Sequence, residues 1–428
     1  MNRADVVVAG AGIAGIATTW QLMEQGVTSV VLVDPRPPLT VTSNKTGANY
    51  RDWWPSAPMV ALTRRSIELM RTLVKSGAPF TMNRRGYLYL STRTDFAGSA
   101  ERFLEPYRRV DLGPMRLHRH SRAADYQLPA RNGLAGPDGA DLLLHPDFIR
   151  QVFPHFSSEV TGAIHARNAG TMDTVALGEY LLDLARRRGA LLVSGEVSGV
   201  EMDGGRVSAV SITQGRQHDR IATRHFVNAA GPFISHVAAR MQVPLPVTNV
   251  LQQKVAFADP QGAIPPESPF TICLDPSGSL PAGLHLKPDS LDGRPVIKLG
   301  CAFNQDPEEP RWDPKGSSDF AARVLGAAAE LVPGMGRYAG QAPVAHEAGY
   351  YTRTPDDLPL VGPLGPEGGF VVGGFAGYGA MVACAAGEIA ASWITGREPP
   401  AWATLFSPDR FARSGYTPPP PEARSGAL

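Results

Sequence analysis

Apolar and polar positions at the start of the chain follow the periods of two strands and one helix. Val6–Val8 form a short apolar run that predicts a buried strand. Apolar residues then recur at helical spacing from Ile13 to Leu22, and Gly26 ends this predicted helix. A second apolar run, Val30–Val33, predicts another strand, so the chain opens with a strand–helix–strand unit.

Three glycines join the first strand to the helix in the pattern G-x-G-x-x-G. Gly10 suits a tight turn, Gly12 lets the backbone approach a pyrophosphate, and Gly15 allows the helix to pack closely on the strand. The phosphates would then lie on the N–H groups of the helix start. Asp34 closes the second strand about 20 residues further on, where an acid binds the ribose hydroxyls. This acid disfavours a 2′-phosphate, so the pattern predicts FAD or NAD and argues against NADP.

Later segments resume this pattern only after a long interruption. A nicotinamide-dependent dehydrogenase usually repeats the strand–helix unit at once, and this chain does not. The elements predicted after residue 34 begin with a helix over 63–75, a strand within GYLYLST (86–92), a helix over 175–188 and a strand over 190–193. They continue with a hairpin over 196–212 with turn glycines at 204 and 205, a strand in FVNAAGP (226–232) that ends in a glycine turn, a strand over 370–372 and a helix over 380–393. A nucleotide domain that is completed from distant segments is typical of flavoproteins, which favours FAD.

Composition and charge narrow the class of protein. A chain of 428 residues exceeds one ordinary hydrophobic core, so two or three lobes are expected. A net charge of +1 without a basic block argues against a nucleic-acid partner. The densest basic cluster, MRLHRH (115–120), is interpreted as a solvated turn in preference to an anion site.

Cysteine usage and the N-terminus bear on the compartment. Cys273, Cys301 and Cys384 lie far apart without a C-x-x-C spacing, so neither a zinc site nor a redox pair is indicated and no metal is expected. Unpaired cysteines suggest a reducing compartment. The N-terminus enters an apolar strand at once without a signal-peptide pattern, and no segment suits a membrane span. The default expectation is a cytoplasmic enzyme without a membrane partner.

A series of motifs in one order over residues 4–412 resembles the FAD-dependent D-amino-acid oxidase/glycine oxidase superfamily, most closely its monomeric sarcosine oxidase branch. The motifs are VVVAGAGIAGIATTWQL with VVLVDP, GEVSGVEMDGGRVSAV with FVNAAGP, GLHLKP with VIKLG, YYTRTPDDLPLVGP (350–363), GFVVGGFAGYGAMVACAAGEIAASWITG (369–396) and FSPDRF (406–411). The resemblance implies an α/β (α+β) fold, with a Rossmann-like FAD-binding domain of the glutathione-reductase type and a substrate domain built on a mixed or antiparallel sheet.

The same resemblance predicts how the chain is divided. The FAD-binding domain would be discontinuous and comprise residues 1–80, 145–232 and 345–412. The substrate-binding domain would comprise residues 81–144 and 233–344. Residues 413–428 are expected to form a disordered, proline-rich tail.

Cofactor-binding positions follow from the resemblance as well. The residues expected to hold FAD are Gly10, Gly12, Ile13, Ala14, Gly15, Asp34, Pro35, Arg36, Thr46, Val197, Ala230, Gly231, Gly374, Phe375, Gly377, Tyr378, Gly379, Ala380 and Met381. The glycine loop 373–379 would face the flavin ring, where N–H groups at a helix start stabilise negative charge. Sarcosine oxidases attach the flavin through a cysteine just before the YYTRTPDD motif. This chain has Gly349 and Tyr350 there, so non-covalent FAD is expected.

Lys298 stands among apolar residues in PVIKLGC (295–301), a predicted buried strand. Burying an ammonium is costly unless something compensates for it. In the sarcosine oxidase branch, the corresponding strand carries a lysine beside the flavin that activates oxygen, and a fixed cation stabilises the anion formed when O2 accepts an electron. The resemblance therefore gives Lys298 a catalytic role and favours an oxidase. The alternative is a lysine at a strand edge whose head group reaches solvent.

The substrate-facing positions depart from that branch. Where sarcosine oxidases have a histidine and, three residues on, a lysine, this chain has Tyr378 and Met381. Arg51 is the candidate partner for a substrate carboxylate, and His285 stands where relatives usually have an aromatic residue. Tyr378 and His285 are the candidates to orient the amine. With the aromatic cluster at 50–54, these changes predict a substrate bulkier or more apolar than sarcosine, and a natural-product intermediate is one option. The alternative is that the two tryptophans of this cluster only pack the domain interface.

The predicted reaction is oxidation of a C–N bond to an imine by hydride transfer to flavin N5, with O2 reduced to H2O2. The substrate would be a small amine or amino acid, and the protein a monomer or homodimer. Two alternatives stay open. One is a dehydrogenase that passes electrons to a quinone or a protein acceptor, which would form no H2O2. The other is a non-catalytic flavin-binding subunit, whose flavin no amine would reduce.

Overall fold

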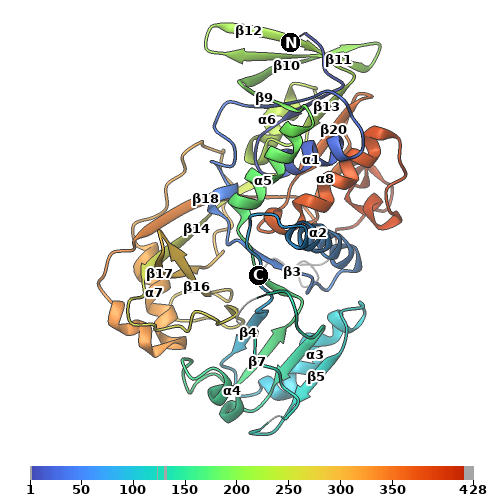
Figure 1. Cartoon of the computed structure of the whole chain (residues 1–428). Coiled ribbons are helices and arrows are strands. Elements are labelled where there is room, and N and C mark those ends of the chain that lie inside the picture. Colours follow the sequence, from blue (N-terminus) through green and yellow to red (C-terminus); the bar gives the residue numbers. More distant parts are fainter. Residues whose placement is uncertain (1, 123, 130–132, 419–428) are drawn as a thin grey trace.

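The chain is described by a computed structural model over residues 2–122, 124–129 and 133–418. The strand–helix–strand unit at its start forms the centre of a six-stranded sheet (Figure 1). The strands, in order across the sheet, are β19 (Leu360–Pro363), β20 (Gly369–Gly373), β13 (His225–Asn228), β1 (Val6–Ala9), β2 (Val30–Asp34) and β9 (Leu191–Ser194). Neighbouring strands are parallel except β19 and β20. The apolar runs of β1 and β2 fit a parallel sheet that is covered on both faces.

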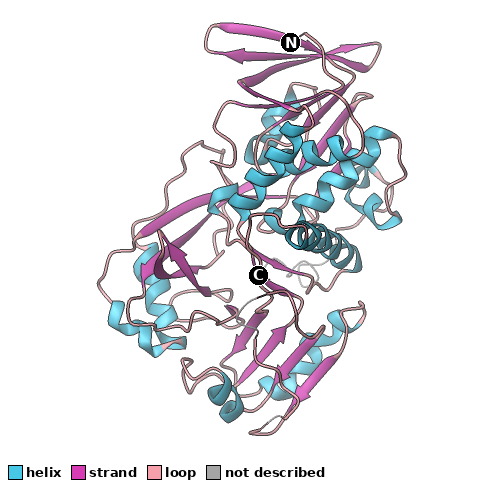
Figure 2. Ribbon diagram, viewed as in Figure 1, coloured by secondary structure: helices cyan, strands magenta, loops and turns pink. Residues whose placement is uncertain are grey.

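Helices cover one face of this sheet, and a small sheet covers the other. Helices α1 (Ile13–Glu24), α5 (Thr174–Arg187) and α8 (Gly379–Thr395) lie on this side, and α2 (Ala57–Lys75) packs against α8 (Figure 2). The second face packs against α6 (Ile234–Ala239) and the antiparallel strands β10 (Glu196–Asp203), β11 (Arg206–Gln214) and β12 (Gln217–Ala222). Helices α1 and α8 can approach closely at Gly387 because this residue has no side chain. A Cβ there would lie 2.7 Å from the backbone of Ala17.

A nine-stranded sheet forms the other large layer. Its strands, in order, are β18 (Ala345–Arg353), β14 (Thr248–Ala258), β17 (Arg294–Gly300), β16 (His285–Leu291), β15 (Phe270–Cys273), β4 (Tyr87–Ser91), β7 (Gly162–Ala166), β6 (Ala140–Leu143) and β5 (Met115–His118). Its pairs are antiparallel except β15 with β4 and β5 with β6. The remaining elements named here are α3 (Phe96–Arg108), α4 (Pro146–Val152), α7 (Phe320–Leu331) and the two-stranded sheet of β3 (Asn49–Arg51) and β8 (Ala169–Thr171).

The fold class predicted from the sequence is confirmed, and the structure refines its details. The hydrogen bonding places β7 and β18 in the nine-stranded sheet, although both lie in segments predicted for the FAD-binding domain. Helix α2 begins at Ala57, six residues before the predicted start, because Pro58 in WWPSAP occupies the first helical turn, which proline tolerates. Within the predicted tail, Tyr416 donates a hydrogen bond to Asp356, and residues 419–428 lie outside the described part of the chain.

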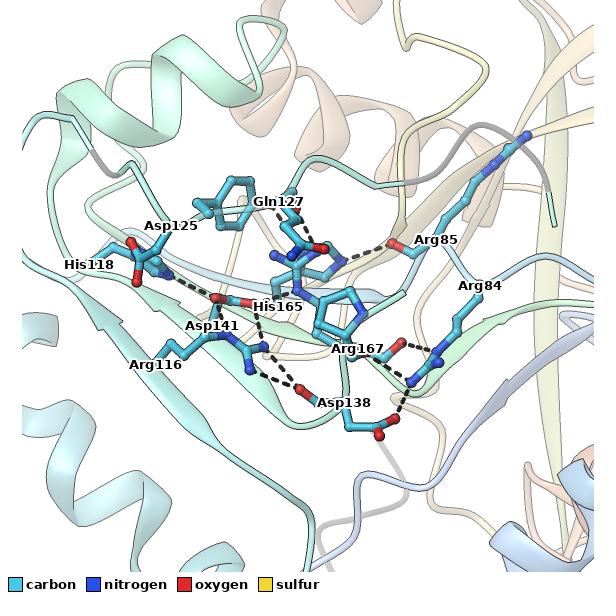
Figure 3. Close-up of polar contacts among 12 residues, drawn as sticks. Arg84, Arg85, Arg116, His118, Asp125, Gln127, Asp138, Asp141, His165 and Arg167 are labelled. Atoms are coloured by element: carbon cyan, nitrogen blue, oxygen red, sulfur yellow. Dashed lines mark hydrogen bonds and ion pairs between the residues drawn. The ribbon is translucent and has the colours of Figure 1, made fainter. Parts of the chain in front are cut away.

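The predicted solvated turn at 115–120 is wrong. Residues 115–118 form the edge strand β5, and the His118 side chain is buried against Asp141 of β6, at 2.7 Å. Arg116 reaches the same carboxylate at 2.7 Å, and Arg167 contacts its other oxygen (Figure 3). The polar residues of this stretch therefore serve a buried ionic network, because Asp141 supplies the compensating charge from a neighbouring strand.

Two facts bear on the environment of the protein. Cys273, Cys301 and Cys384 are free thiols, and all three are buried. In the described ranges, the helices are all too short or too polar to traverse a lipid bilayer.

Candidate functional site

A cavity of about 560 Å³ is lined by residues from both large sheets and from the loops that leave them. It starts at the carboxyl ends of β1 and β2, where Gly10 and Asp34 face it. It ends among side chains of β3, β4, β15 and β16, where Arg51 and His285 face it. The cavity thus joins the predicted dinucleotide motif to the predicted substrate residues.

The dinucleotide end has the shape that the glycine motif predicts. Gly10 has a φ of +102°, and a Cβ there would lie 2.4 Å from the Ala229 carbonyl oxygen. A Cβ on Gly15 would lie 1.8 Å from the Gly10 carbonyl oxygen, so α1 can pack on β1 only with glycine at this position. The Asp34 carboxylate accepts hydrogen bonds from the backbone N–H of Ala11 at 2.6 Å and of Arg36 at 2.8 Å, and burial raises its pKa. A carboxylate held in this way can accept further bonds from ribose hydroxyls.

The glycine loop before α8 forms another wall of the cavity. It is fixed by the Ala376 N–H, which donates to the Thr352 carbonyl at 2.9 Å, and by the Tyr378 hydroxyl, which donates to the Asp357 carbonyl. Tyr378 is the last residue before the helix, and Gly379 and Ala380 begin it. The start of α8 therefore presents its N–H groups to the cavity, where they favour an electron-rich partner.

Seventeen of the nineteen predicted cofactor residues line the cavity. They are Gly10, Gly12, Ile13, Ala14, Asp34, Pro35, Thr46, Val197, Ala230, Gly231, Gly374, Phe375, Gly377, Tyr378, Gly379, Ala380 and Met381. The other two, Gly15 and Arg36, do not. Gly15 serves the packing of α1 on β1, and Arg36 turns to Asp313, whose carboxylate lies 2.8 Å from its guanidinium.

Arg51 is buried at the opposite end of the cavity, on the two-stranded sheet of β3 and β8. Only 4% of the residue is exposed. Its guanidinium donates to the Tyr89 hydroxyl and lies 4.4 Å from the ring centre of Trp54 and 5.6 Å from that of Tyr87. A cation held between aromatic faces is stabilised without losing its capacity to bind an anion.

His285 lines the same end of the cavity as a neutral acceptor. Its Nδ1 lies 3.1 Å from the Gly283 carbonyl oxygen, which can only accept, so Nδ1 carries the proton and Nε2 the lone pair. Burial lowers the pKa of this imidazole to about 4. Nε2 faces Gly300 of β17, where a Cβ would approach it to 2.4 Å.

Lys298 is not where the resemblance places it. It is absent from the cavity lining in the described structure, and its Nζ lies 2.9 Å from the Asp289 carboxylate, which Lys287 also reaches at 3.1 Å. Asp289 on the neighbouring strand β16 draws the ammonium to itself. The alternative holds in part: β17 lies between β14 and β16 and is no edge strand, but 26% of the Lys298 side chain is exposed.

Lys254 of β14 supplies a cation to the cavity. Its side chain is 13% exposed, and its Nζ donates to the Thr46 carbonyl and lies 2.8 Å from the Glu347 carboxylate. Burial lowers the pKa of this ammonium, and Glu347 opposes the shift. The sequence analysis missed Lys254, although a lysine inside the apolar strand LQQKVAF is the same signal that singled out Lys298.

The aromatic side chains have divided roles. Trp54 lines the cavity. Trp53 instead stacks on Tyr107 with ring centres 4.8 Å apart, so the alternative of a packing role applies to Trp53. The hydroxyl of Tyr378 is held by Asp357, so its ring lines the cavity but its hydroxyl is not directed to orient an amine. Sequence reasoning did not predict six aromatic residues that line the cavity: Tyr87, Phe233, Phe270, Trp312, Tyr350 and Tyr351. For Tyr87, Tyr350 and Tyr351 the alternation in GYLYLST and YYTRT was the available signal.

Comparison with known proteins matches residues 5–393 to the family described as FAD dependent oxidoreductase. The chain belongs to this family. "Dimethylglycine dehydrogenase, mitochondrial" from Mus musculus is 24% identical over 425 residues, which cover 96% of this chain and 44% of that protein. The chain thus spans less than half the length of this curated relative.

Two solved structures show the shared fold. L-proline dehydrogenase from P. horikoshii superposes with a TM-score of 0.78 at 20% identity, covering 97% of this chain and 100% of that one. Glycine oxidase from Geobacillus kaustophilus gives a TM-score of 0.75 at 20% identity, covering 95% and 98%. The superfamily predicted from the motifs is confirmed, and the protein is an FAD-dependent oxidoreductase.

FAD fits the residues present. The glycine turn at Gly10 and the start of α1 suit its pyrophosphate, Asp34 suits its ribose, and the start of α8 suits its ring.

Proposed function

We propose that this enzyme oxidises a C–N bond of an amino or imino acid that carries an apolar or aromatic group, and that O2 accepts the electrons. The observation that carries the proposal is Arg51, a buried cation set among aromatic rings in the same cavity as Asp34. Bound FAD would supply the hydride acceptor.

Arg51 would anchor a substrate carboxylate. A buried guanidinium is costly to desolvate, and a carboxylate that binds it through two parallel hydrogen bonds offsets that cost. Trp54, Tyr87 and Phe270 then form walls that favour a ring or a branched apolar substituent over the methyl group of a small amine.

His285 would orient the amine. Its Nε2 is an acceptor at neutral pH, since burial lowers the pKa of the ring to about 4. It can accept an N–H bond from the substrate nitrogen and so hold the neutral amine with its lone pair free.

Lys254 is the cation that we assign to the oxygen step in place of Lys298. It lines the cavity, and Glu347 helps to keep it protonated despite burial. A fixed positive charge in a dry site stabilises the anion formed as O2 is reduced. Lys254→Met should slow reoxidation of the reduced enzyme by roughly tenfold or more while leaving anaerobic reduction by substrate intact. Slow reoxidation in Lys298→Met alone would return the assignment to Lys298.

A dehydrogenase is the second candidate. It is favoured by the pairing of Lys298 with Asp289, which takes the lysine of the resembling branch out of the cavity lining. Flavin reduction by substrate without H2O2 formation in air would select it over the oxidase.

The test uses matched pairs of amines. Apolar and aromatic amino and imino acids are compared with the amines that lack only the carboxylate, and H2O2 is measured in air. The proposal expects the acids to react with a kcat/KM roughly tenfold to a hundredfold higher, the worth of a charged hydrogen-bonded contact. Equal rates for both members of every pair would contradict the role of Arg51.

A further inference from the structure

The segment of residues 302–318, called the strap here, joins β17 to α7 and crosses from the nine-stranded sheet to the dinucleotide end of the cavity. Three of its residues, Ala302, Pro310 and Trp312, line the cavity. Their neighbours in that lining include Phe233 and His236, which follow β13 in the other large sheet. The strap therefore bridges the two layers at the place where the cavity begins.

Trp312 is held on two sides. Its ring stacks on that of Phe233, with centres 4.0 Å apart and planes at 25°. The Arg36 guanidinium lies 5.6 Å from the centre of the Trp312 ring, and the same guanidinium pairs with Asp313 at 2.8 Å. Arg36 thus connects the loop after β2 to the strap.

The rest of the strap is anchored by polar contacts. The Tyr350 hydroxyl accepts from the Arg311 N–H at 3.1 Å and donates to the Glu308 carboxylate at 2.9 Å. The Glu308 N–H donates to the Asn249 carbonyl at 2.9 Å, and Glu309 lies 3.3 Å from His236. These contacts fix the direction in which Trp312 points.

The position of Trp312 identifies the part of FAD that it meets. Arg36 lies two residues after Asp34, the ribose-binding acid, and Phe233 lies two residues after Gly231, which lines the cavity. The purine of FAD is joined to that ribose, so this is the end of the cavity that would hold it.

We propose that the strap closes the adenosine end of the cavity and retains the cofactor. Trp312, held between Phe233 and Arg36, forms the wall of this end of the cavity, and the Arg36–Asp313 pair ties the strap to the loop that carries Asp34.

The test measures FAD release from the holoenzyme, followed by the fluorescence of free flavin. Trp312→Ala should release FAD roughly tenfold faster or more, because it removes the large apolar side chain that walls this end of the cavity. Trp312→Phe should stay near the wild-type rate, and Asp313→Asn should change it by less than about fivefold, because the pair is exposed. Trp402→Ala, outside this cavity, and Asp306→Asn, an exposed acid of the strap, are the matched controls.

A second measurement uses the wild-type chain. Trypsin can cut the strap after Arg311 and Lys315, and bound FAD should slow both cuts relative to the apoprotein. Calorimetry with AMP on apoprotein should show weaker binding to Trp312→Ala than to Trp402→Ala. The proposal is overturned if Trp312→Ala releases FAD no faster than Trp402→Ala, if Trp312→Phe is as fast as Trp312→Ala, or if FAD leaves both cleavage rates unchanged.

Discussion

Lys254 and His285 stand in the same row of the nine-stranded sheet, one on each side of Gly300. In the register, Gly300 pairs with Lys254 of β14 and with His285 of β16. Because Gly300 has no side chain, the imidazole can lie over β17, with Nε2 at 2.4 Å from the place a Cβ would take. The His285 imidazole, proposed to orient the substrate, and the Lys254 ammonium, proposed to act on oxygen, thus flank the same glycine of β17.

Gly300→Ala tests this arrangement. The new methyl group would push the His285 ring out of its place, so kcat/KM should fall by roughly tenfold or more while FAD stays bound. Gly326→Ala in α7 is the matched control, because a Cβ there meets nothing within 4 Å. Substrate kinetics and the flavin content of both variants are the measurements. Equal activity in the two variants would show that the position of His285 does not matter.

Arg51→Met should act on substrates according to their charge. The loss of the guanidinium should weaken binding of carboxylated amines by about 1.5–3 kcal/mol, and amines without a carboxylate should bind about as well as before. Anaerobic titration of flavin absorbance gives both dissociation constants. Arg102→Met, at an exposed position of α3, controls for loss of an arginine. A uniform loss across both substrate types would mean that Arg51 only supports the fold.

The stability of the protein should depend on pH through three histidines, of which His165 is buried and His155 and His285 are half-buried. Burial lowers the pKa of His155 and of His285 to about 4 and that of His165 to about 3, from 6.5. At pH values between the folded pKa of about 4 and the ordinary pKa of 6.5, the unfolded chain binds more protons than the folded one. The free energy of unfolding therefore falls as the pH drops from 6.5 towards 4, and it is regained as the pH rises.

The slope of that loss is the quantity to measure. Each histidine adds at most about 1.4 kcal/mol per pH unit within its window. Urea unfolding at several pH values should show a shallower slope in His155→Phe, whose new ring would pack with Phe153 and Phe156. An unchanged slope in this variant would contradict the burial of a neutral imidazole at 155.

Asp141→Asn should be strongly destabilising. Asp141 is 1% exposed and is contacted by Arg116, His118 and Arg167, so neutralising it leaves buried positive charge without compensation (Figure 3). The expected loss is about 3–5 kcal/mol in the free energy of unfolding. Asp138→Asn, whose side chain is 74% exposed, should cost less than about 1 kcal/mol. Similar losses in the two variants would show that the network is not a buried ionic one.

The sequence predicts best what is local. The dinucleotide unit depends on spacings within one strand–helix–strand segment, and Gly10, Asp34 and the start of α8 all line the cavity as expected. Arg51 and His285 were found because their motifs keep a fixed order along the chain. Each of these residues lies close in sequence to the glycine or strand that positions it.

Residues that depend on partners far along the chain were missed or misplaced. Lys298 turns to Asp289 because the register of β16 and β17 brings that acid beside it. Lys254 reaches the cavity only through the pairing of β14 with β17. Trp312 depends on a loop that crosses to Phe233, nearly eighty residues earlier in the chain. Sequence periodicity carries no information on such pairings.

The most direct test of the account is an absorbance spectrum of the purified protein, taken before and after anaerobic addition of apolar and aromatic amino and imino acids. The account predicts the visible absorption of bound FAD, its bleaching by at least one of these acids, and much weaker bleaching in Arg51→Met. A colourless protein that FAD cannot reconstitute, or a yellow one that no amine reduces, would contradict it.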